Sequence, residues 1–194
     1  MHLHNILSQE LTRFGDAPLR VVETGTIRDE REETGLGGDG WSTTFFAERD
    51  KKTNEPHTHM FVSIDLDTSI AESVLRAKGL RDHVQMIRGY SVSALGALLG
   101  SKGFGTYDVA FLDSDNNAQL IFDEFLIAQH LVRAGGLIIV DDVRMPHQPE
   151  GAHKGDIVLP HVQKREYFKH QLFEREGWRG YKCGVLVIQN VPTW

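Results

Sequence analysis

Short apolar runs rich in β-branched residues alternate along the chain with longer stretches whose apolar residues recur at helical spacing. This alternation is typical of a parallel sheet that is covered by helices on both faces. We therefore expect an α/β fold with a doubly wound sheet that is mostly parallel and has an antiparallel C-terminal strand. Its first five strands are predicted at Leu19–Glu23, Met60–Leu66, Val84–Arg88, Tyr107–Asp113 and Gly136–Asp142.

The clearest helix is predicted after Asn117, and the pair Gly135-Gly136 stops it. Its apolar residues fall at spacings that keep one side of the helix against the sheet. These residues are Ile121, Phe125, Ala128 and Val132.

The C-terminal part is predicted to contain one more helix and a pair of strands. The helix should run from about Pro160 to Glu176 and bury Phe168 and Leu172. The β-like runs Trp178–Lys182 and Cys183–Gln189 are too close together for a crossover helix. We expect these two runs to pair antiparallel.

Composition narrows the class of protein. A chain of 194 residues with 40% hydrophobic residues can bury one sizeable core, so residues 1–194 are expected to form a single domain. A formal net charge of -6 argues against nucleic acid or an anionic membrane as the partner, and a small molecule is expected instead.

Cys183 is the lone cysteine, which fits a reducing, cytoplasmic location. The N-terminus resembles neither a signal peptide nor a membrane span, and the sequence leaves the oligomeric state, a homodimer included, open.

The first candidate site element is Glu23-Thr24-Gly25-Thr26, which closes the first predicted strand. A second glycine-rich stretch, Gly38 to Thr43, opens a helix. Glycines at a strand-to-helix turn let the backbone approach a ligand closely, and a helix N-terminus offers free N–H groups. An acid at the strand end suits a cationic ligand. The alternative is a tight turn followed by an ordinary helix cap.

Two further groups of acids follow predicted strands, whose carboxyl ends line the ligand site in folds of this type. Asp65 can accept hydrogen bonds from both ribose hydroxyls of a nucleoside, whereas Asp67 is expected to cap the next helix. The alternative is that Asp65 is itself only a helix cap. Asp113 ends one strand, and Asp141 and Asp142 end its predicted neighbour. Three acids that meet raise one another's pKa unless a cation lies between them, and such oxygen ligands favour Mg²⁺ or Ca²⁺. The alternative is that they are helix caps and solvated loop acids.

In their order and spacing these motifs resemble the class I S-adenosylmethionine-dependent methyltransferases, which have a Rossmann-like sheet. The closest resemblance is to the branch with catechol-type and macrolide- or cephamycin-tailoring O-methyltransferases. Besides the elements above, it is carried by Gly-Trp-Ser-Thr, Gly89-Tyr90-Ser91, and Phe-Leu-Asp with Gly-Gly-Leu-Ile-Ile-Val-Asp-Asp. The resemblance implies that the cofactor S-adenosylmethionine contacts Glu23, Gly25, Ser42, Asp65, Ser91 and Asp113. It also implies that Asp113, Asp141 and Asp142 hold Mg²⁺.

Two departures from the family pattern concern catalysis. Residues 28–40 form an insertion that we expect to act as a lid. Where catechol-type enzymes place a lysine base, this chain has Asn116, so we assign the catalytic roles to Asp113 and to His147 and His153 in the loop 144–159.

The expected function is metal-assisted O-methylation of a small-molecule hydroxyl. One alternative is a nicotinamide-dependent oxidoreductase, which the lack of Gly-x-Gly-x-x-Gly and of Tyr-x-x-x-Lys disfavours. The other alternative is a cofactor-binding module without catalysis.

Overall fold

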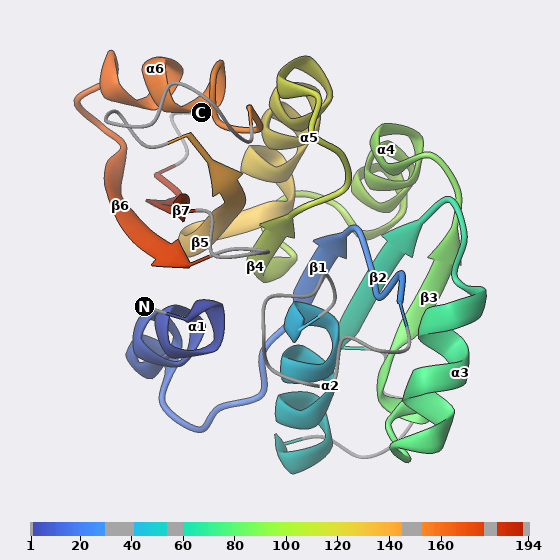
Figure 1. Cartoon of the computed structure of the whole chain (residues 1–194). Helices are drawn as coiled ribbons and strands as arrows, with labels where there is room; N and C mark the ends of the chain where they lie inside the picture. Colours follow the sequence, from blue (N-terminus) through green and yellow to red (C-terminus); the bar gives the residue numbers. More distant parts are fainter. Residues whose placement is uncertain (1, 30–40, 54–59, 145–152, 177–181, 192–194) are drawn as a thin grey trace.

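The computed structural model describes residues 2–29, 41–53, 60–144, 153–176 and 182–191. These residues build one seven-stranded sheet in the order β3-β2-β1-β4-β5-β7-β6 (Figure 1). The strands are β1 Val21–Thr24, β2 Phe61–Asp65, β3 Gln85–Arg88, β4 Tyr107–Leu112, β5 Val132–Val143, β6 Lys169–Glu176 and β7 Lys182–Gln189. Strands β1 to β5 pair in parallel, and β7 is antiparallel to both β5 and β6. The predicted fold class is confirmed.

Helices cover both faces of the sheet (Figure 1). The helices on one face are α1 Leu3–Leu11, α2 Trp41–Thr53 and α3 Ser69–Ala77, and those on the other are α4 Ser91–Lys102, α5 Ala118–Leu131 and α6 Val158–Gln163. Two short 3-10 turns, η1 Thr12–Phe14 and η3 Arg81–His83, follow α1 and α3. Strand β4 shows how one strand serves both layers. Val109 and Phe111 belong to the core under α1 to α3, while Ala110 and Leu112 belong to the core under α4 and α5.

The five predicted parallel strands are confirmed to within a few residues, and so is the start of the helix after Asn117. The predicted end of that helix is wrong, because α5 ends at Leu131, while Val132 and the pair Gly135-Gly136 belong to strand β5. The Asn117 side chain accepts hydrogen bonds from the backbone N–H groups of Gln119 at 2.9 Å and Leu120 at 3.2 Å, so it caps α5.

The C-terminal predictions are wrong in part. Helix α6 ends at Gln163, and the segment Lys169–Glu176 is strand β6 instead of the second half of a helix. Its many charged residues suit an edge strand, where one side of the strand faces solvent, and pairing with β7 decides its conformation. The predicted hairpin within 178–189 is also wrong, since Lys182 begins the same strand as Cys183 and that strand pairs with β5 and β6. Residues 178–181 lie outside the described residues.

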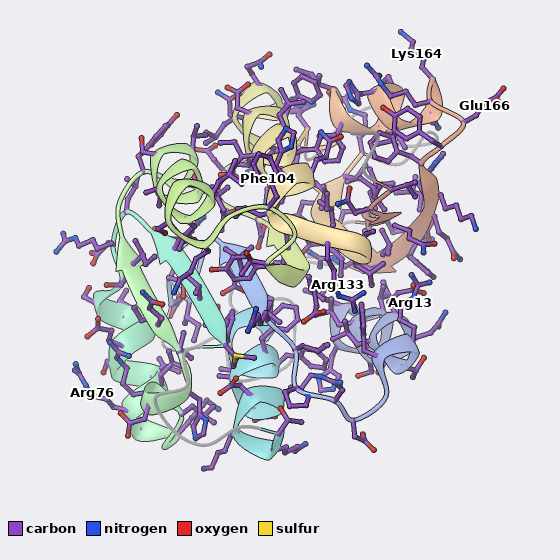
Figure 2. The ribbon with its side chains drawn as sticks, turned by 180° about the vertical axis from the view of Figure 1, so that it is seen from behind. Arg13, Arg76, Phe104, Arg133, Lys164 and Glu166 are labelled. Atoms are coloured by element: carbon purple, nitrogen blue, oxygen red, sulfur yellow. The ribbon has the colours of Figure 1, made fainter. Side chains whose placement is uncertain are left out.

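Strand β1 pairs with β2 on one side and with β4 on the other. The strand order therefore reverses between β1 and β4. Ligands of doubly wound sheets bind outside the carboxyl ends of the strands at such a switch point. Charged side chains such as Arg76 and Lys164 project outward from the periphery (Figure 2). Within the described ranges, no helix is long and apolar enough to cross a membrane.

Candidate active site

Glu23 lies at the carboxyl end of β1 and is completely buried. Its Oε2 accepts hydrogen bonds from the hydroxyls of Thr43 at 2.8 Å and Ser63 at 2.7 Å. Among the described residues its Oε1 has no hydrogen-bond partner, although this atom is buried. Burial raises the pKa of Glu23 to about 7, although the nearby hydroxyls of Ser42, Ser63 and Thr43 oppose this shift. A buried, unsatisfied carboxylate oxygen is costly, so it indicates a place for a donor from a ligand.

Gly25 follows β1 at the point where the backbone after β4 comes closest to it. Its φ of +86° favours glycine, and a Cβ at this position would lie 2.4 Å from the backbone oxygen of Asp113. The backbone N–H of Asp113 donates to the carbonyl of Thr24 at 2.9 Å. Gly25 therefore lets the loop after β4, which begins with Asp113, approach the turn after β1.

Asp65 ends β2 beside this turn. Its Oδ2 accepts a hydrogen bond from the Thr26 N–H at 3.0 Å and lies 3.6 Å from Nε of Arg28, and its Oδ1 accepts from the Asp67 N–H at 3.2 Å. The carboxylate is thus fixed next to Glu23 and Gly25. Two carboxylate oxygens offer about four acceptor positions in total, so acceptor capacity remains for a ligand. Asp67 accepts from the Ser69 N–H at 3.0 Å, but the N-cap residue of α3 is Thr68 and not the predicted Asp67.

Two large apolar side chains follow the adjacent strand ends and are exposed. Leu66, directly after β2, is 65% exposed, and Tyr90, just before α4, is 53% exposed. Next to Tyr90, Ser91 is buried and begins α4. Exposed apolar groups beside Asp65 offer contact to a flat ring of a nucleoside.

Glu124 on α5 is a site residue that the sequence did not suggest to us. It is completely buried and accepts hydrogen bonds from the hydroxyls of Thr24 at 2.7 Å and Ser114 at 2.5 Å, and its side chain also bonds to Ser91. It therefore connects the turn after β1, the loop after β4 and the start of α4. The sequence does hold a sign of this role. Glu124 lies three residues after Ile121, so a charged residue falls on the apolar side of the helix.

The three acids predicted to converge do so. One carboxylate oxygen from each of Asp113, Asp141 and Asp142 lies within 4.8 Å of the others. Consecutive residues of a strand normally point to opposite faces. At Asp141 and Asp142 the pairing of β5 with β7 shifts register, and Asp142 has a φ of 52°. This bulge lets both carboxylates reach the same point as Asp113.

Two buried cations surround these acids. Arg175 donates to both oxygens of Asp141, at 2.8 and 2.7 Å, and to Oδ1 of Asp142 at 2.8 Å. Lys154 donates to Oδ1 of Asp113 and lies 3.4 Å from Oδ2 of Asp142. Five of the six carboxylate oxygens in the cluster therefore face Lys154 or Arg175, and the exception is Oδ2 of Asp113.

The pKa values of the cluster follow from burial and these charges. Burial raises the pKa of Asp113 to about 7, although the Lys154 ammonium pulls it down. Burial would also raise the pKa of Asp142, but Lys154 and Arg175 hold it below its ordinary value. Burial alone would lower the pKa of Lys154, and the neighbouring acids Asp113 and Asp142 outweigh this and raise it. Lys154 is consequently an ammonium at neutral pH.

The cluster does not fit Mg²⁺ as it stands. Magnesium needs free oxygen ligands at about 2.0–2.1 Å in an octahedral arrangement. The two oxygens of Asp141 are both bonded to Arg175, and the Lys154 ammonium lies among the oxygens that an ion would use. The convergence of the acids is confirmed, while the metal ion stays a prediction that these contacts disfavour.

The predicted histidines and lid are placed only in part. His153 has its Nδ1 3.2 Å from Oδ2 of Asp156 and also contacts Arg144, and its side chain is half exposed. His147 and residues 30–40 of the predicted lid lie outside the described residues. Lys154, next to His153, is a site residue that the sequence did not reveal, because a lysine in an irregular loop carries no pattern that sets it apart from a solvated surface lysine.

The fold is a doubly wound α/β sheet, and the candidate site lies across the carboxyl ends of β1, β2 and β4. A family profile described as a methyltransferase domain matches residues 35–143, which is more than half of the chain. The chain belongs to this methyltransferase family. The predicted resemblance to methyltransferases is confirmed.

Among curated proteins, O-methyltransferase hkm8 of Aspergillus hancockii is 27% identical over 128 residues. The match covers 64% of this chain and 43% of that relative, so the chain spans less than half of the relative's length.

Solved structures with the same fold include cofactor-bound Rv0187 from MTB, with a TM-score of 0.71 and 21% identity over 96% of this chain and 78% of that one. An O-methyltransferase from Bacillus cereus in complex with SAH has a TM-score of 0.68 and 20% identity over 95% of this chain and 79% of that one. At these identities the likeness concerns the fold.

Proposed function

We propose that the protein is an S-adenosylmethionine-dependent methyltransferase that methylates a hydroxyl oxygen of a small molecule. The observation that carries the proposal is the buried Oε1 of Glu23, which lacks a partner among the described residues. An amino acid ammonium is the kind of donor that this oxygen requires. The proposal is further supported by the family of the chain and by the names of its relatives.

The residues around Glu23 match the remaining parts of this cofactor. Asp65 would accept the ribose hydroxyls, and Leu66 and Tyr90 would contact the adenine ring. Glu23 and Ser42 would hold the methionine end, and Ser91 and Glu124 would keep the start of α4 in place. A cofactor bound across these residues would reach the ends of β1 and β4, where Asp113 lies beside Gly25.

The bound cofactor supplies an electrophilic methyl group on a sulfonium. Transfer of this methyl group would exchange its bond to sulfur for a bond to the acceptor oxygen, and the hydroxyl would give up its proton. We assign the proton to Oδ2 of Asp113, because burial raises the pKa of this carboxyl to about 7 and a base works best near the working pH. The protein's other contribution is alignment of the two reactants.

The proposal is tested with methyl-labelled S-adenosylmethionine and a panel of phenols, catechols and aliphatic alcohols. We expect label to appear on the oxygen of at least one acceptor, with an equal amount of S-adenosylhomocysteine. Asp113→Asn should lose most of this turnover and keep cofactor binding, whereas Asp82→Asn, an exposed control on η3, should leave turnover unchanged. A protein that neither binds the cofactor nor transfers label would contradict the proposal.

A further inference from the structure

Lys154 occupies the position that a cation would take among the three acids. It contacts Asp113 and Asp142 from a side chain that is 5% exposed, and the ligand atoms of the three acids lie within 4.8 Å of one another. When all three carboxyls are ionised they carry three negative charges, and Lys154 and Arg175 contribute two positive ones. The pair of side chains thus supplies the charge of one divalent cation.

The backbone around Lys154 fixes its position. A Cβ on the next residue, Gly155, would lie 2.3 Å from Cγ1 of Val143, so the absence of a side chain lets this segment pack directly on β5. The carbonyl of Gly155 accepts a hydrogen bond from the Leu159 N–H at 2.9 Å, and the carbonyl of His153 accepts from the Asp156 N–H at 3.0 Å. Lys154 is therefore anchored on both sides, unlike a lysine at the end of a free surface loop.

Lys154 and Arg175 lie outside the part of the chain that carries the family pattern. The family match covers residues 35–143 and includes Asp113, Asp141 and Asp142, whereas both cations follow it. Arg175 reaches the acids from β6, across β7, where it lies opposite Cys183. The acids and their internal partners thus come from different parts of the sequence.

We propose that Lys154 takes the role of a divalent cation in this protein, so that methyl transfer proceeds without a metal. The ammonium offsets the charge of Asp113 and Asp142. Among the described residues, these two acids are its acceptors, which leaves one N–H for the oxygen that receives the methyl group. A fixed positive charge at that oxygen stabilises the negative charge that develops as the proton leaves. The identity of that oxygen rests on the proposed function.

The first test is manganese binding to protein that has been stripped with chelator, measured by calorimetry and by electron paramagnetic resonance of free Mn²⁺. We expect the wild type to bind no Mn²⁺ at the cluster. Lys154→Ala should bind one ion, with an affinity about tenfold or more above the detection limit that the wild type fails to reach, because a repelling charge a few ångströms away is gone. Its melting temperature should rise with Mn²⁺, while the wild type and the exposed control Lys164→Ala should show no rise.

A double variant, Lys154→Ala with Asp113→Asn, locates the new site and should lose the bound ion. The proposal is overturned if the wild type binds an ion that Asp113→Asn removes, or if Lys154→Ala binds Mn²⁺ no better than the wild type. If Lys154→Ala fails to fold, Lys154→Met replaces that variant. The Mn²⁺ measurement on the wild type remains decisive in either case. Titration of S-adenosylhomocysteine into the same samples separates the two proposals: a wild type that does not bind it contradicts the proposed function, and the manganese result is still readable.

Discussion

Arg175 holds Asp141 with two parallel hydrogen bonds, although strand β7 separates the strands that carry them. The two side chains are 11% and 3% exposed. A planar guanidinium matched to a carboxylate in this way is the strongest form of ion pair that side chains make. The pair connects the C-terminal strands of the sheet to the acid cluster.

Arg175→Ala should therefore destabilise the fold. Removing one partner leaves the Asp141 charge buried without compensation, which typically costs about 3–5 kcal/mol. Arg76→Ala is the matched control, since Arg76 pairs with Glu72 at 2.8 Å on an exposed part of α3 and should cost less than about 1 kcal/mol. Urea unfolding measures both. Equal losses of unfolding free energy in the two variants would show that the buried Arg175–Asp141 pair stabilises the fold no more than an exposed pair does.

Gly25→Ala should destabilise the protein even without a ligand. A Cβ would meet the backbone of Asp113, and a φ of +86° adds about 1–2 kcal/mol for a residue with a side chain. Gly96→Ala serves as control, because Gly96 lies within α4 with open space around its Cα, and alanine there should stabilise by up to about 1 kcal/mol. The free energy of unfolding, measured with no cofactor present, distinguishes the two. A Gly25→Ala variant as stable as the wild type would leave ligand contact as the sole reason for this glycine.

Cofactor binding should release a proton at Glu23. The free carboxyl has a pKa of about 7, and a cationic ammonium beside it favours the ionised form, which lowers this pKa in the complex. Below pH 7 binding must therefore expel a proton, and affinity should fall by up to about tenfold for each pH unit. Calorimetry at pH 6 in buffers of different ionisation enthalpy counts the protons. Glu23→Gln should lower this count, and an unchanged count in that variant would assign the proton to another group.

The acid cluster could be predicted from the sequence because each member ends a strand that hydrophobic pattern alone defines. Neighbouring strands then bring these acids to one edge of the sheet, and the bulge at Asp142, which the pattern does not reveal, lets both Asp141 and Asp142 reach Asp113. Their partners could not be predicted in the same way. Lys154 lies in an irregular segment whose path depends on how Gly155 packs against β5. Arg175 was assigned to a helix, and its contact with Asp141 arises from the pairing of β6 with β7, which local pattern does not reveal.

The most direct test of the account is calorimetric titration of S-adenosylhomocysteine into the wild type, Asp65→Ala and the control Asp82→Ala, in buffer that contains chelator. Asp65 ends β2 next to the turn that holds Gly25, and its loss should remove the proposed ribose contact while leaving the fold intact. We predict that the wild type and Asp82→Ala bind one molecule with equal affinity, and that Asp65→Ala binds about 1.5–3 kcal/mol more weakly. A wild type that fails to bind, or an Asp65→Ala variant with unchanged affinity, would contradict the account.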